Sequence, residues 1–109
     1  MLTIDKDTLS IKIIAKDSGD FVLTLDNYLL ASGDEVIFTV SKEIGKETYV
    51  IQKRITEFND GSVIISITPT DTDLPLGEYY YDIQVNAADG RVDTVVGPAK
   101  FKVIGGVTY

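Results

Sequence analysis

GEYYYDIQVN, at residues 77–86, is the most regularly patterned stretch of the chain. From Tyr79 to Val85 every second residue is aromatic or aliphatic, and the residues between them, beginning with Tyr80, are mostly polar. The side chains of a β-strand point alternately to the two faces of a sheet. This period of two therefore predicts a strand with Tyr79 and Tyr81 in the core and Tyr80 outside it.

Similar alternation recurs along the rest of the chain, between clusters of Gly, Asp, Asn and Ser that favour tight turns. These clusters lie about a dozen residues apart, a spacing typical of all-β sandwiches. No segment has a sustained helical period. The other segments with strand character are residues 9–13, 21–25, 36–40, 48–55, 63–67 and 92–103.

Pro98 interrupts the last of these segments. Proline has no backbone N–H and cannot donate to a strand ladder, so we expect Pro98 to mark an edge strand, a bulge or a switch between sheets. The final strand ends at Ile104. The length and composition are those of one globular domain. We expect residues 1–104 to form it and residues 105–109 to be a flexible C-terminal end.

The spacing of strands and turns predicts an immunoglobulin-like β-sandwich, with about seven to eight antiparallel strands in two sheets. In that fold a Gly-x-Tyr-x-Cys run opens one strand, and the Tyr hydroxyl bonds to upstream backbone in a tyrosine corner. Gly77 and Tyr79 match this run, which makes Tyr79 a tyrosine-corner candidate, and Tyr81 stands in the cysteine position. The alternative is that both tyrosines are simply core-facing aromatic residues.

The composition excludes several functional classes. The chain has no His and no Cys, which removes His-based catalytic triads, thiol nucleophiles, zinc-thiolate sites and disulfides. Its 17 acidic and 10 basic residues give a net charge of −7, which disfavours nucleic acid and anionic membranes as partners. The longest uninterrupted apolar run, Tyr28 to Ala31, is too short to cross a bilayer. We therefore predict neither a nucleic-acid nor a membrane partner.

Acidic side chains allow two further interpretations. Asp71, Asp73, Glu78 and Asp82 offer oxygen ligands for a hard cation such as calcium. The spacing lacks the glycine-containing ladder of a dedicated calcium loop, so we favour Asp71 or Asp73 as turn-capping residues and predict no metal and no cofactor. A small filled sandwich also lacks the cleft that paired acid and base carboxylates require, so we predict that the protein is not an enzyme.

Several apolar side chains occupy positions that should face solvent. They are Val22, Ile37, Ile64 and Tyr80, with Val50 as a weaker candidate. An apolar patch on the outside of a sheet is a common feature of protein interfaces. We expect these side chains to cluster on one sheet face, where the chain would bind itself or another subunit. The alternative is that they are isolated exposed residues or are covered by a neighbouring loop.

A series of short motifs also carries a family resemblance, and its most specific element is the Gly-x-Tyr-x-Tyr-Asp-Ile-Gln run that begins at Gly77. The series resembles the small immunoglobulin-like domains of Gram-positive phage and prophage tail proteins, and in particular the N-terminal domain of phage baseplate upper proteins. It covers nearly the whole chain, from Leu9 to Thr108. The motifs are GDEVIFTV at 33–40, IQK at 51–53, DG at 60–61, ITPTDT at 67–72, LGEYYYDIQV at 76–85 and the ending at 97–108.

The resemblance implies a non-catalytic structural or assembly module of a tail or baseplate, a virion component assembled in the bacterial cytoplasm. Its partners would be other virion subunits or itself. Domains of this kind often begin a longer protein with a receptor-facing or fibre region, so the chain is expected to be either a separate accessory piece or part of a longer product. The alternative function is a cell-surface or carbohydrate-binding module, in which Tyr28, Tyr80 and Tyr109 would provide planes for sugar stacking.

Overall fold

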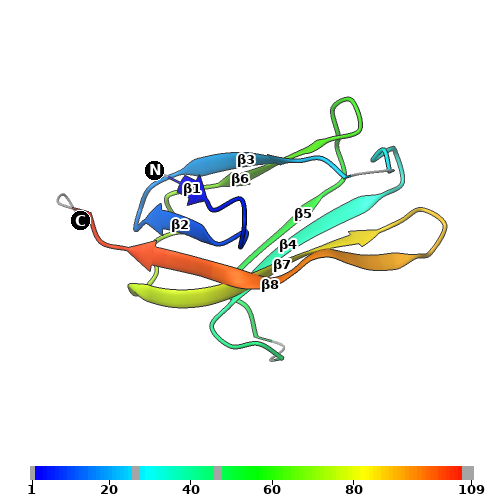
Figure 1. The fold of residues 1–109 in the computed structure, drawn as a ribbon. Helices are drawn as coiled ribbons and strands as arrows, with labels where there is room; N and C mark the ends of the chain where they lie inside the picture. The colour runs from blue at the N-terminus through cyan, green and yellow to red at the C-terminus, as the bar shows by residue number, and fades with distance from the viewer. Residues whose placement is uncertain (1, 26–27, 46–47, 107–109) are drawn as a thin grey trace.

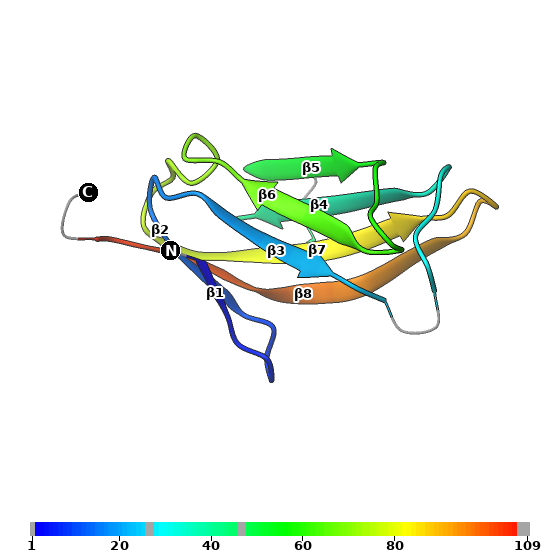
Figure 2. The ribbon, with the colours of Figure 1, turned by 90° about the horizontal axis from the view of Figure 1, so that it is seen from above.

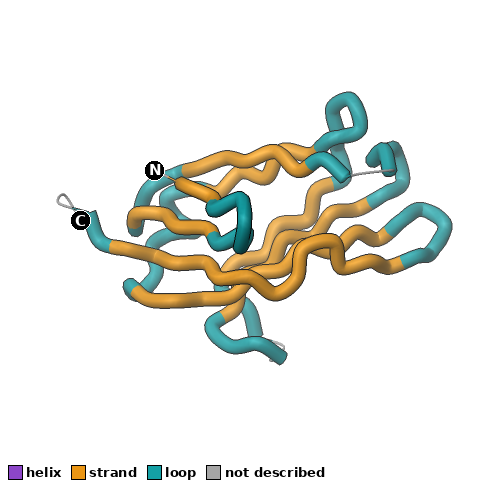
Figure 3. The backbone as a smooth tube through the Cα atoms, viewed as in Figure 1, coloured by secondary structure: helices purple, strands orange, loops and turns teal. Residues whose placement is uncertain are grey.

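The computed structural model describes residues 2–25, 28–45 and 48–106 of the chain. These residues form eight β-strands and no helix (Figures 1 and 3), which confirms the all-β prediction. The strands are β1 (Leu2–Ile4), β2 (Ile11–Ile14), β3 (Gly19–Leu23), β4 (Glu35–Ser41), β5 (Ile51–Ile55), β6 (Val63–Ile67), β7 (Gly77–Asn86) and β8 (Val92–Ile104).

The strands form two sheets that lie one over the other (Figures 1 and 2). The larger sheet has six strands in the order β1-β2-β8-β7-β4-β5, and the smaller sheet pairs β3 with β6. The strand pairs are antiparallel with one exception, because β2 runs parallel to β8 and pairs Ile11 with Phe101 and Val103 with Ile13.

The expectation of antiparallel strands throughout is therefore wrong at the β2–β8 pair. Strand direction follows from which segments meet in space, whereas the alternation of side chains fixes only which face of each strand is buried. Leu9 also departs from the sequence pattern. It precedes β2, has a φ of 63° and is 41% exposed, so the alternation predicted from Leu9 begins only at Ile11.

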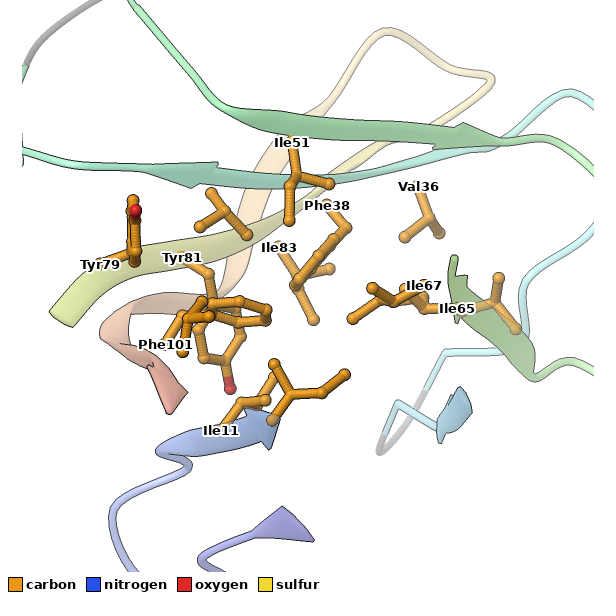
Figure 4. Packing of buried hydrophobic residues seen from close by; sticks show 14 of the residues in the cluster. Ile11, Val36, Phe38, Ile51, Ile65, Ile67, Tyr79, Tyr81, Ile83 and Phe101 are labelled. Atoms are coloured by element: carbon orange, nitrogen blue, oxygen red, sulfur yellow. The ribbon is translucent and has the colours of Figure 1, made fainter. Parts of the chain in front are cut away.

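One hydrophobic core fills the space between the two sheets, and aromatic rings occupy its centre (Figure 4). The ring of Phe38 on β4 lies 5.7 Å from that of Phe21 on β3, 5.5 Å from Tyr81 and 6.3 Å from Phe101, measured between centroids. Rings at such separations attract each other beyond the free energy of burying their area. Phe38 therefore joins one strand of the small sheet to two further strands of the large sheet.

The alternation in β7 is borne out residue by residue, since Tyr79, Tyr81, Ile83 and Val85 are buried. Both buried tyrosine hydroxyls have partners. The hydroxyl of Tyr79 donates to the carbonyl oxygen of Pro75 at 2.7 Å, and the hydroxyl of Tyr81 donates to the carbonyl oxygen of Leu9. Burial raises the pKa of both side chains, so both stay protonated at neutral pH.

Pro98 lies at a β-bulge, one of the three expected positions. Tyr81 pairs with Ala99 and Ile83 pairs with Val96, so two steps along β7 correspond to three steps along β8. The neighbouring strand β2 reaches only residues 101–104 of β8. Pro98 therefore lies where β8 has a single neighbour, and its missing N–H does not interrupt a second ladder.

Strand β8 ends at Ile104, the residue at which the last strand is predicted to end. Gly105 and Gly106 follow it without regular secondary structure. Residues 107–109 lie outside the described part of the chain, so the flexible end stays a prediction.

Replacing Tyr79 by Phe tests the role of its hydroxyl. The change leaves the ring in the core but removes the donor to Pro75, so we expect the free energy of unfolding to fall by about 1 kcal/mol. Tyr80→Phe is the matched control, because the Tyr80 side chain lies on the outer face, and it should change stability by less than about 0.5 kcal/mol. Urea unfolding measures both. Equal stabilities of the two variants would contradict a structural role for the Tyr79 hydroxyl.

Candidate interaction surfaces

Val22 and Ile64 form an exposed apolar pair on the outer face of the small sheet. They are direct neighbours across β3 and β6, and they are 62% and 53% exposed. Their position follows from the alternation, because the adjacent residues Phe21 and Ile65 point into the core. This pair has the exposure that the interface hypothesis requires.

Ile37 and Tyr80 lie instead on the outer face of the large sheet, on the other side of the molecule. Ile37 is only 6% exposed, so the expectation that it faces solvent is wrong. It sits between Arg54 and Gln84 on the neighbouring strands. Long polar side chains cover apolar neighbours with their aliphatic stems, which accounts for the burial of Ile37.

The four candidate residues therefore do not form one patch, and the expectation that they cluster on a single sheet face is wrong. The small sheet carries Val22 and Ile64, and the large sheet carries Tyr80 over a polar background. Val50 is 42% exposed and lies in the loop just before β5. The periodicity identifies outward positions correctly, but it does not say to which of the two sheets a strand belongs.

The outer face of the large sheet is hollowed on both sides of Tyr80. One hollow, of about 390 Å³, runs toward the β4–β5 loop and includes Tyr49 and Asp82. The other, of about 740 Å³, runs toward the β1–β2 hairpin. Ile44, Tyr80 and Pro98 line both hollows, so together they form a trough with Tyr80 at its middle. Burial raises the pKa of Asp82 in the first hollow.

Asp71 behaves as the turn-capping interpretation predicts. Its carboxylate accepts a hydrogen bond from the backbone N–H of Thr68 at 2.8 Å and lies 2.7 Å from the ammonium group of Lys53. Burial of Asp71 opposes ionisation, but the hydrogen bonds from Lys53 and Thr68 outweigh it and lower the pKa. Within residues 2–25, 28–45 and 48–106, no three carboxylates converge in a way that would hold a metal ion.

Asp34 is a buried charged residue that the sequence analysis missed. It is 4% exposed, and its carboxylate accepts hydrogen bonds from the backbone N–H groups of Ala31 and Ala88 and from the Tyr28 hydroxyl. The two backbone donors lower the pKa of Asp34. The Ser-Gly-Asp sequence at 32–34 indicates that Asp34 is a turn residue. Its bond to Ala88 in the β7–β8 loop could not be predicted from the sequence, because the two residues are far apart in the chain.

The carbohydrate-binding alternative relied on three tyrosines, and their surroundings differ. Tyr28 is half-buried, its hydroxyl is bonded to Asp34, and the guanidinium of Arg91 lies 5.9 Å from its ring centre. Tyr28 therefore serves the packing of its own loop. Tyr80 is half-buried on the trough, with part of its surface accessible. Tyr109 lies outside the described residues.

Comparison with known proteins gives no family for this chain: no protein-family model and no curated protein matches its sequence. No helix with the length and hydropathy of a membrane span occurs in the part of the chain that the structure describes.

Replacing Asp34 by Asn should destabilise the protein at neutral pH, because the amide cannot accept the same charge-assisted hydrogen bonds. The folded-state pKa of Asp34 is lowered from 3.8, so its ionisation stabilises the fold above that pH. This contribution is lost as the pH falls through the lower, folded-state pKa. We therefore expect the stability difference between the original chain and D34N to shrink on acidification, as measured by urea unfolding at a series of pH values.

Asp82→Asn is the control for this experiment. Burial raises the pKa of Asp82, so the folded state disfavours its charged form. The neutral Asn should therefore maintain or increase stability at neutral pH. A D82N variant destabilised as much as D34N, or a D34N difference that does not change with pH, would contradict these assignments.

Proposed function

We propose that the chain is a non-catalytic, immunoglobulin-like module of a phage or prophage tail or baseplate, which acts through protein–protein contacts. The phage assignment rests on the sequence resemblance described above. The immunoglobulin-like assignment is supported by strand order, by the Tyr79 hydrogen bond and by the composition of the core.

The strand order is compatible with an immunoglobulin-like arrangement. In variable-type domains, strands G, F, C and C′ are neighbours in one sheet, and strands B and E belong to the other. Here β8, β7, β4 and β5 are neighbours in that order, and β3 pairs with β6. The small sheet has two strands instead of the usual four, so the proposal is a reduced form of the sandwich with an added β1–β2 hairpin.

The observation that carries the proposal is the hydrogen bond from the Tyr79 hydroxyl to the Pro75 carbonyl oxygen. A tyrosine corner places its residue near the start of strand F and bonds it to backbone a few residues upstream. Tyr79 occupies this place in β7, which follows β6 just as F follows E. Any core-facing tyrosine needs a partner for its hydroxyl, as Tyr81 has in the Leu9 carbonyl. What favours the tyrosine corner is that the Tyr79 partner lies four residues upstream on the same chain.

The core offers a second line of support. An antibody domain packs a strand-C tryptophan against a disulfide between strands B and F. The corresponding strands here contribute Phe38 from β4, Phe21 from β3 and Tyr81 from β7, and the three rings are in contact through Phe38. An aromatic cluster thus occupies the region that the disulfide and tryptophan fill elsewhere.

The test of the assembly role is incorporation into particles. We expect an epitope-tagged copy, expressed in the bacterium that carries the gene, to co-purify with tail or baseplate structures after prophage induction. The double variant Val22→Ser, Ile64→Ser should fold but be incorporated less, because it removes the exposed apolar pair of the small sheet. A tagged chain that is absent from purified particles would overturn the proposal.

The same pair predicts how the isolated protein behaves in solution. We expect concentration-dependent self-association in sedimentation velocity, weakened by the Val22→Ser, Ile64→Ser double variant. The matched control is Leu76→Ser with Val92→Ser, because these two side chains are about as exposed but lie elsewhere. A chain that stays monomeric at high concentration, or a control that dissociates equally, would show that this surface does not mediate self-contact.

A carbohydrate-binding surface is the second candidate function. It is favoured by one feature, the trough on the large sheet with the Tyr80 side chain at its middle. Aromatic side chains with one accessible face stack on sugar rings, so Tyr80 is the residue through which such binding would occur.

A further inference from the structure

The larger hollow of the trough is lined by four neighbouring strands, β1, β2, β8 and β7, by the turn of the β1–β2 hairpin and by Ile44 of the β4–β5 loop. Its volume of about 740 Å³ is within the range of small-molecule sites. Strands β2 and β8 form its floor, the hairpin forms one side, and Tyr80 on β7 forms the other. The hairpin projects from the body of the molecule in Figure 2, and residues of its two strands and its turn line the hollow.

The charge of this hollow is opposite to that of the whole protein. Lys12, Lys100 and Lys102 line it together with a single carboxylate, that of Asp5, although the chain has a net charge of −7. Lys100 is paired with Glu78 at 3.4 Å. Among the described residues, no carboxylate forms an ion pair with Lys12 or Lys102, although Glu78 is the direct neighbour of Lys102 on β7. Because Glu78 pairs with Lys100, it offsets one positive charge and leaves an excess of lysines at this hollow.

Lys12 and Lys102 are direct neighbours across the parallel β2–β8 pair. Both point to the outer face, because Ile11 and Phe101, one residue before each of them, are buried in the core. Like charges placed directly opposite each other destabilise a sheet. An anion held between the two ammonium groups would remove this repulsion and form charge-assisted hydrogen bonds with both.

The rest of the lining restricts the kind of anion. Tyr80 is the direct neighbour of Lys100 on the adjacent strand, so an aromatic ring lies beside the positive charge. Thr3 and Ser10 add hydroxyl groups around the same hollow. An aromatic plane, several hydroxyls and a local positive charge together fit a sugar ring that bears a carboxylate.

The net charge of the chain argues against a densely charged polymer such as nucleic acid. The repulsion from the whole molecule would act on every phosphate of such a ligand, whereas the lysines occupy one small region. At physiological ionic strength, exposed charges are screened beyond about 8 Å. A ligand with one carboxylate therefore interacts mainly with the lysines next to it.

We propose that the hollow between the β1–β2 hairpin and Tyr80 is a binding site for a uronic-acid type of sugar, with its carboxylate between Lys12 and Lys102 and its ring against Tyr80. This deepens the second candidate function and rests on it, and it is independent of the assembly role. The particle-incorporation experiment can therefore fail while the sugar site is confirmed, and the sugar titration can fail while the assembly role is confirmed.

The test is an NMR titration of the isotope-labelled full chain with methyl glucuronide and, separately, with methyl glucoside. The two sugars differ in the carboxylate that the lysines would bind. We expect the glucuronide to shift the amide signals around Lys12, Tyr80 and Lys102, and to bind at least about tenfold more tightly than the glucoside. Equal binding of both sugars, or no shifts with the glucuronide, would overturn the proposal.

Acetate supplies the carboxylate without the sugar. We expect it to bind more weakly than the glucuronide, because it cannot use Tyr80 or the hydroxyl groups. Acetate binding as tight as that of the glucuronide would reduce the site to a simple anion site and overturn the sugar assignment. These three titrations use the unaltered chain, so they decide the question even if a variant fails to fold.

Variants locate the site. The double variant Lys12→Gln, Lys102→Gln should weaken glucuronide binding by about tenfold, and Tyr80→Ala should weaken both sugars. Arg91→Gln is the control, because it also removes a positive charge but lies in the β7–β8 loop away from the hollow, and it should leave the affinity within about twofold. Unchanged binding in the lysine variant would place the sugar elsewhere.

Discussion

The hydrophobic core lies between a sheet of six strands and a sheet of only two, so two strands cover one whole side of it. The ring of Phe38 holds the two sheets together, because it packs near Phe21 from the small sheet and near Tyr81 and Phe101 from the large one. A large aromatic side chain buries about 150–250 Å² and gains further from edge-to-face contacts with other rings. The positions of β3 and β6, and therefore of the surface they present outward, depend on this cluster.

The two outer faces that result are chemically different. The small sheet presents Val22 and Ile64 as a flat apolar pair, whereas the large sheet presents a trough with lysines, hydroxyls and Tyr80. A flat apolar surface is suited to another protein surface, and a polar concave one is suited to a small hydrophilic ligand. The two proposed functions therefore use separate parts of the molecule and do not compete.

Sequence periodicity was sufficient to predict seven of the eight strands, the buried face of β7 and the bulge at Pro98 as one of three alternatives, because each depends on local chemistry. It missed β1 (Leu2–Ile4), which is too short to show a period of two. It could not predict the parallel β2–β8 pair, since neither segment carries information about the direction of the other. For the same reason it missed the cover over Ile37, the distant partner of Asp34 and the Lys12–Lys102 pair. All these features join residues far apart in the chain, and they become visible only when the register of the sheet is known.

Tyr81 stands two residues after Tyr79, where antibody domains have a cysteine of their inter-sheet disulfide, and its ring packs near Phe38 and Phe101. The chain has no cysteine, so its two sheets are held together by noncovalent contacts that no reductant can break and no oxidant needs to form. Thiols such as glutathione leave the resistance of this domain to unfolding unchanged. No disulfide has to form in this fold, so its stability does not depend on the thiol–disulfide balance of its surroundings.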